Sequence, residues 1–179
     1  RVLFPRPACA AAVGARETRD LFRFLGRFLA KALVDDRLVD LPFSQAFWRV
    51  ALGRGDIGLR DLAELDPALA STLWRMARLC EERAHLVAAG AGAAEIQEAL
   101  LLDGVRIEDL CLDFTLPGAA SIELCPGGMD RAVTIFNLDE YVHLVTRTSL
   151  MSAVEEPFRE FRRGFEEVLP LDELRAFSE

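Results

Sequence analysis

Apolar residues recur at steps of three and four between residues 19 and 33, a spacing that predicts an α-helix. The stripe consists of Leu21, Phe22, Phe24, Leu25, Phe28, Leu29, Ala32 and Leu33. A stripe this wide is typical of a helix buried on more than one side, so we expect a central helix. Arg23, Arg27 and Lys31 form the one ridge left for solvent, and Thr18 is placed to cap the first turn.

Polar caps mark the starts of two further helices. Ser44 precedes a short amphipathic run that Gly53 ends, and Asp66 precedes Pro67, a residue type favoured at the first helical position. The Pro67 helix is expected to continue to the next glycines. Its broad apolar face comprises Leu69, Leu73, Met76, Leu79, Cys80 and Leu86. Another short helix is expected over residues 93–104.

After Asp109 the sequence pattern changes from helical spacing to short β-prone runs. Three β-prone runs, CLDFTLPG, SIELCPGG and RAVTI, are separated by proline and glycine, which predicts a small antiparallel meander. A helix then begins at Asn137, because Asn137 and Glu140 have capping-box spacing and Phe136 and Tyr141 flank them as a hydrophobic staple. The last long helix carries the apolar stripe Phe158, Phe161, Phe165 and Val168.

Composition narrows the class of protein. The 179 residues are 51% hydrophobic and 28% charged, which is ordinary for a globular domain. The pattern of expected elements makes its fold class α+β and mostly α-helical. A net charge of −8 argues against broad nucleic-acid binding, which needs a positive face toward the phosphates. No apolar run has the ~20 residues of a membrane-spanning helix, so no membrane partner is expected.

Candidate chemistry within the chain is sparse. Cys9, Cys80, Cys111 and Cys125 are far apart and form no CxxC pair, so we expect no disulfide framework, no metal site and no cofactor. The sequence has no phosphate-binding glycine loop and no GxSxG elbow. A hydrolase that uses scattered carboxylates stays open, since nothing selects a pair. The residues alone therefore indicate a helix-dominated interaction domain.

The order and spacing of several stretches extend this interpretation. They are FRFLGRFLAKALVDDRLVDLPF, DLAELDPALASTLWRM, IEDLCLDFTLPG, IELCPGGMDRAVTIFNLDEYVHLV and FREFRRGFEEVLPLDELRAF. Together they resemble the N-terminal lobe of a HECT-type ubiquitin ligase domain, of the branch with upstream armadillo-type repeats. The resemblance implies a large helical subdomain, residues 1–65 and 146–179, and an inserted smaller subdomain, residues 66–145, that contains the meander.

In such a lobe the smaller subdomain docks a ubiquitin-conjugating enzyme through an apolar groove. The groove residues implied here are Leu69, Thr72, Leu73, Trp74 at the rim, Asp109, Cys111 and Tyr141. Tyr141 also suits an interface on physical grounds, because a rigid aromatic at the centre of a groove is a typical hot spot. The alternative for Leu69, Leu73 and Tyr141 is a place in the ordinary core.

The family resemblance also implies an enzyme of which this chain is one part. The reactive cysteine is expected in a C-terminal catalytic lobe beyond Glu179, so this chain holds no catalytic residue and is expected to form no thioester by itself. Expected partners are a ubiquitin-conjugating enzyme charged with ubiquitin, that catalytic lobe, and protein substrates held by regions outside the chain. The expected location is the cytoplasm or nucleus of a eukaryotic cell. A non-catalytic helical adaptor that keeps the fold without the groove is the alternative.

Overall fold

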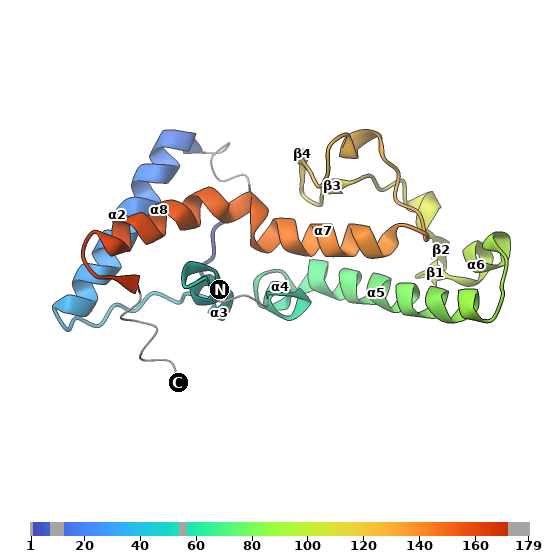
Figure 1. Cartoon of the computed structure of the whole chain (residues 1–179), viewed down its shortest axis with the longest axis horizontal. Coiled ribbons are helices and arrows are strands. Elements are labelled where there is room, and N and C mark those ends of the chain that lie inside the picture. Colours follow the sequence, from blue (N-terminus) through green and yellow to red (C-terminus); the bar gives the residue numbers. More distant parts are fainter. Residues whose placement is uncertain (1, 8–12, 54–56, 172–179) are drawn as a thin grey trace. The chain divides into compact units, whose positions relative to one another are not determined.

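The computed structural model describes residues 2–7, 13–53 and 57–171, and it confirms a mostly helical α+β fold (Figure 1). Two compact units divide the chain: a first unit of residues 1–57 and 149–179, and a second unit of residues 58–148. The border differs from the expected one at α4 (Leu59–Leu65). This helix lies in the second unit because it packs on α5 (Pro67–Ala88).

Two glycines bring the long helices of the first unit into backbone contact. α2 (Ala15–Val34) packs along α8 (Glu155–Glu166). A Cβ atom added at Gly26 of α2 would lie 2.7 Å from the Phe165 nitrogen, and one added at Gly164 of α8 would lie 2.7 Å from the Arg23 carbonyl carbon. Glycine within a helix costs about 1 kcal/mol relative to alanine, and here it permits a contact that no side chain would allow.

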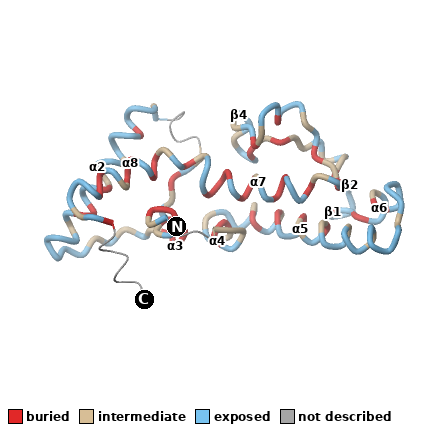
Figure 2. Tube along the Cα trace, viewed as in Figure 1, coloured by how far each residue is buried: buried red, intermediate tan, exposed pale blue. Residues whose placement is uncertain are grey.

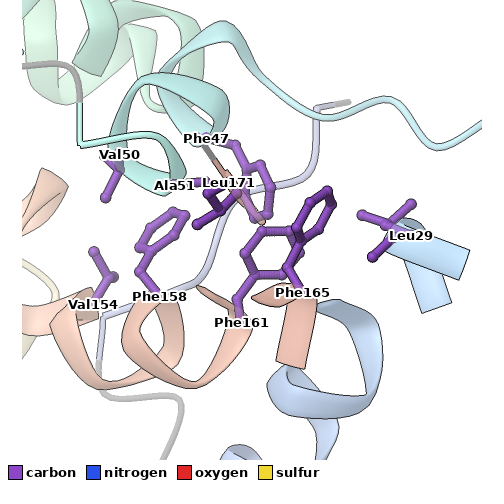
Figure 3. Close-up of a cluster of buried hydrophobic side chains, with 10 residues drawn as sticks. Leu29, Phe47, Val50, Ala51, Val154, Phe158, Phe161, Phe165 and Leu171 are labelled. Atoms are coloured by element: carbon purple, nitrogen blue, oxygen red, sulfur yellow. The ribbon is translucent and has the colours of Figure 1, made fainter. Parts of the chain in front are cut away.

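Aromatic rings fill the core of the first unit. Phe158, Phe161 and Phe165 extend from α8 toward α3 (Gln45–Ala51), as Figure 3 shows. The Phe47 ring of α3 lies 5.1 Å from both the Phe158 and the Phe161 ring centroids. The predicted stripe on α8 is confirmed for its three phenylalanines, whereas Val168 is 37% exposed.

The first helix is less buried than its pattern predicts. The buried residues of α2 are Thr18, Gly26, Leu29 and Ala30, and they face one side. Leu21, Phe24 and Phe28 are 57%, 58% and 43% exposed. Much of α2 has the pale blue of exposed residues in Figure 2. The expectation of a central helix is therefore wrong, because α8 is the main element packed on α2.

Thr18 does not cap α2, and the basic ridge is not simply solvated. The Thr18 hydroxyl lies inside the helix and donates to the Gly14 carbonyl oxygen at 2.7 Å. Arg23 and Arg27 both pair with Glu167 beyond the end of α8, so two of the three ridge residues bridge the helices. These pairs are half exposed, and exposed pairs add little stability because water screens them.

The predicted cap of α3 is confirmed, and a distant arginine completes the helix. The Ser44 hydroxyl accepts a hydrogen bond from the Phe47 backbone nitrogen at 2.9 Å. At the other end, the Arg162 side chain from α8 donates to the carbonyl oxygens of Ala51, at 2.8 Å, and Val50. Carbonyl groups in the last turn of a helix have no N–H partner further along that helix. Arg162 donates hydrogen bonds to two of them.

After α4 and α5, the described part of the second unit contains two further α-helices, two 3-10 helices and two small hairpins. Along the chain after α5 they are α6 (Ala93–Ala99), β1 (Leu101–Leu102), β2 (Val105–Arg106), the 3-10 helix η1 (Ile107–Leu110), β3 (Thr115–Leu116), β4 (Ala119–Glu123), the 3-10 helix η2 (Gly128–Asp130) and α7 (Leu138–Leu150). A 3-10 helix, η3 (Ser152–Val154), then leads into α8. The predicted meander is a two-stranded antiparallel hairpin, β3–β4, and the third β-prone run adds one bridge, Asp113 to Ala132.

One predicted helix is partly wrong. The helix expected over 93–104 ends at Ala99, and the following residues form the hairpin β1–β2 around Asp103 and Gly104. Both turn residues have positive φ, +53° and +84°. Asp-Gly is a preferred pair for the two-residue turns that need this geometry.

Within the described residues, no helix combines the length and the apolarity needed to cross a bilayer. Cys80, Cys111 and Cys125 are free thiols. Cys9 lies outside the described residues.

Candidate functional site

The accessible part of the predicted groove begins on the first turns of α5. The Asp66 side chain caps this helix by accepting from the Leu69 nitrogen at 3.0 Å, as predicted, with Pro67 at the first position. Leu69 and Thr72, three residues apart on the same face, are both half-buried. Leu73 is 1% exposed and belongs to the core, so its direct contact with a partner is a corrected expectation.

An ion pair joins this face of α5 to the β1–β2 turn. The Arg75 guanidinium donates to both carboxylate oxygens of Asp103, at 2.7 and 2.5 Å, and also to the Thr72 hydroxyl at 3.3 Å. Both bonds to Asp103 come from one guanidinium nitrogen, Nη1, and the bond to Thr72 comes from the other, Nη2. Arg75 therefore positions the hairpin beside Thr72.

The β1–β2 hairpin is followed at once by the segment that contains two further predicted groove residues, Asp109 and Cys111. Arg106 at the end of β2 holds the Asp109 carboxylate with bonds of 2.8 and 3.0 Å. Cys111 follows in the left-handed conformation, with φ of +50°, and its exposed thiol lies 3.7 Å from the Asp109 carbonyl oxygen. Asp109 and Cys111 are both at the surface, as expected.

We name these residues the α5–hairpin surface. Its members are Leu69, Thr72, Arg75, Asp103, Arg106, Asp109 and Cys111. The sequence analysis missed the three that organise it, Arg75, Asp103 and Arg106. The Asp-Gly pair at 103–104 was a readable signal for the turn, whereas no local pattern pairs Asp103 with Arg75, 28 residues away.

Trp74 lies elsewhere on α5. Residues two apart on a helix are separated by about 200° around the axis, so Trp74 faces away from Thr72. The Trp74 side chain is 43% exposed, consistent with a position on the outer side of the helix. The expectation that Trp74 forms the rim beside Thr72 conflicts with this placement.

Tyr141 is buried rather than open to a partner. It is 2% exposed, and its ring meets Phe114 edge-to-face with centroids 5.6 Å apart. The Arg131 guanidinium covers the Phe114 ring at 4.1 Å and bonds to both Glu140 oxygens, at 2.7 and 2.6 Å. An open tyrosine ring is therefore a wrong expectation for this conformation.

The predicted capping box of Asn137 and Glu140 is also wrong, because Arg131 binds the Glu140 side chain. Glu140 turns to Arg131, and its hydrogen bond to that guanidinium lowers the Glu140 pKa. The Asn137 side chain accepts from the Thr134 nitrogen at 2.7 Å, upstream of the helix. Phe136, the other half of the expected staple, is 44% exposed.

The burial of Tyr141 can be tested by a spectroscopic titration of its phenol. Burial raises the pKa of its phenol from 10.0 to about 12. The folded state therefore favours the neutral ring, so this stabilisation is complete below pH 10 and is lost as pH rises from 10 to about 12. Tyr141 is the only tyrosine, so phenolate absorbance near 295 nm reports it alone.

We expect the absorbance midpoint near pH 12 for the native chain and near 10 for the chain in urea. The Tyr141→Phe variant provides the blank. A native midpoint equal to the unfolded one would show that the ring is accessible to water.

These features define a helical module with an accessible, hydrogen-bonded surface. The family model described as HECT-domain (ubiquitin-transferase) matches residues 2–179. The chain belongs to this family, which confirms the resemblance found in the sequence.

Individual relatives of the chain support the same family assignment. The chain is 39% identical to the zebrafish E3 ubiquitin-protein ligase TRIP12 over 87% of its own length and 8% of that protein. It is 34% identical to the Arabidopsis thaliana E3 ubiquitin-protein ligase UPL4 over 99% of its length, and 37% identical to UPL3 of the same plant over 98%. The chain spans 12% of UPL4 and 9% of UPL3, so it corresponds to a small part of each relative.

Proposed function

We propose that the chain recruits a ubiquitin-conjugating enzyme through the α5–hairpin surface of the second unit. In the whole protein, ubiquitin would then pass to a cysteine outside this chain and from there to a substrate lysine. The observation that carries the proposal is the half-buried face of Leu69 and Thr72, which Arg75 links to the β1–β2 hairpin. Family membership supplies the partner class.

The composition of the surface suits a transient partner. Leu69 is its one large aliphatic residue, and the other members include two ion pairs, Arg75–Asp103 and Arg106–Asp109. Such a surface gives a small and largely polar contact, which is typical of partners that exchange rapidly. Rapid exchange is needed because a spent conjugating enzyme has to leave before a charged one binds.

The two buried residues keep a supporting place in the proposal. Leu73 follows Thr72 on α5 and anchors that turn in the core. Tyr141 packs against Phe114, which comes three residues after Cys111 in the chain. We assign them to the positioning of the surface rather than to contact with the partner.

A binding titration tests the proposed surface. We expect Leu69→Ala to weaken binding of a ubiquitin-conjugating enzyme by roughly tenfold, since truncating a central interface residue typically costs 1 kcal/mol or more. Thr72→Arg should have a similar effect by adding bulk to the same face. Trp74→Ala is the matched control, because it removes a larger exposed side chain from the other side of α5.

The titration uses isotope-labelled chain with a panel of free and ubiquitin-charged enzymes, followed by NMR. Shifts centred on Leu69 and Thr72 and absent at Trp74 would support the proposal. If Trp74→Ala weakens binding and Leu69→Ala leaves it unchanged, the surface is misplaced. If no enzyme of the panel binds at high micromolar concentration, the adaptor interpretation replaces recruitment.

A further inference from the structure

The outer side of α2 presents an apolar stripe to solvent. Leu21, Phe24 and Phe28 are each more than two-fifths exposed, and the rings of Phe24 and Phe28 stack with centroids 6.1 Å apart. Their spacing of three and four residues keeps them on one face. Phenylalanine side chains in such a row are unusual on a surface that contacts only water.

The same stripe ends in opposite charges. Glu17 lies four residues before Leu21, and Lys31 lies three residues after Phe28. The spacing from Glu17 to Lys31 is therefore 4-3-4-3, the a/d pattern of a helix that pairs with another helix. Both charged residues are exposed, and Lys31 has an exposed partner in Asp35 at 2.7 Å.

This order of residues is complementary to itself when reversed. In an antiparallel pair of α2 helices centred on Phe24, each Phe24 faces its copy, and each Leu21 lies within one residue, about 1.5 Å along the axis, of the Phe28 of the other chain. The same register sets each Glu17 opposite a Lys31. A parallel pair would instead place like charges together at both ends, which is unfavourable.

We propose that the stripe Glu17, Leu21, Phe24, Phe28 and Lys31 docks a second copy of this chain as an antiparallel, two-fold symmetric helix pair. The contact is isologous, so the symmetry closes it at two chains. Its residues all lie in the first unit, whereas the α5–hairpin surface lies in the second. The two proposals therefore fail or succeed independently.

The expected dimer is weak. The stripe spans about 21 Å at 1.5 Å per residue, and a single helix pair of that length buries less than the roughly 1,200 Å² of a standard stable interface. We therefore expect reversible association with a dissociation constant on the order of 100 μM.

Sedimentation of the 179-residue chain from 5 to 500 μM at low salt tests the proposal through a charge swap. Glu17→Lys alone and Lys31→Glu alone each place like charges at both ends, and we expect each to raise the dissociation constant at least tenfold. The double variant restores opposite charges in reversed order and should return it to within threefold of the parent. Phe24→Asp should leave a monomer at every concentration.

Arg78→Glu on α5 is the charge-matched control for Lys31→Glu, since Arg78 is an exposed helical residue of the second unit. It should not change association. Circular dichroism of every variant checks that the helices are retained. A parent chain that stays monomeric to 500 μM overturns the proposal, and so does a dimer that the double variant fails to restore.

Discussion

The Gly164→Ala variant is expected to lose at least about 2 kcal/mol of the folding free energy of the first unit. Alanine is the better helix former by about 1 kcal/mol, so the local preference favours the substitution. The new methyl group would nevertheless overlap the Arg23 carbonyl group, with the Arg23 Cα only 3.0 Å away. A backbone carbonyl inside α2 has no rotamer to change, so α2 and α8 would have to separate along their whole contact.

Each unit contains one tryptophan, which makes the loss measurable for one unit at a time. Trp48 lies beside Phe47 in the first unit, and Trp74 lies in the second. In a Trp74→Phe background, Trp48 fluorescence during urea unfolding reports the first unit. Gly92→Ala is the control, because no atom lies within 4 Å of its added Cβ and its φ of −77° suits alanine. Equal urea midpoints for the two glycine variants would refute the close contact.

The second large effect is expected from Phe161→Ala, which should destabilise the first unit by 3–5 kcal/mol. The Phe161 ring is fully buried and packs 5.1 Å from Phe47 and 6.1 Å from Phe165. Its removal leaves a cavity that neither neighbour can fill, since both rings are themselves held in the core. The same Trp48 fluorescence assay measures the change.

Phe24→Ala is the matched control for this cavity, because it removes the same side chain from an exposed site on α2. At 1 μM, where the chain is monomeric, we expect a change within about 0.5 kcal/mol. A comparable loss for the two variants would mean that the Phe161 ring is not the centre of the core.

Local signals in the sequence were reliable where the partner is a few residues away. Ser44 and Asp66 cap the helices that follow them because each bond closes over three residues. Asn137 and Glu140 have an equally good local pattern, yet Arg131 takes Glu140 with two bonds. A bidentate guanidinium outweighs one backbone bond, and its position depends on the fold of the preceding loop.

Periodicity identified α2 but not which of its residues are covered. The spacing of Leu21, Phe24 and Phe28 resembles that of core residues, whereas burial depends on α8 at the other end of the chain. Gly26 was the better local indication, since a helical glycine often marks the close approach of another backbone.

For the candidate site, the structure can be compared with the sequence only in how far each residue is exposed. Leu69 and Thr72 are half-buried in the first two turns of α5, whereas Asp109 and Cys111 are exposed at the end of η1 and just after it. Leu73 and Tyr141 are buried, and nothing in their own neighbourhoods distinguishes a residue under a surface from one on it. The pair of Arg75 with Asp103 spans 28 residues, so no local pattern predicts it either.

The pairing of α2 with α8 sets an order for synthesis. Arg23 and Glu167 are 144 residues apart, so the glycine face of α2 leaves the ribosome long before its partner exists. The second unit is one continuous segment, residues 58–148, and its contacts form without the chain ends. We therefore expect the inserted unit to fold first, with α2 exposed to chaperones until α8 arrives.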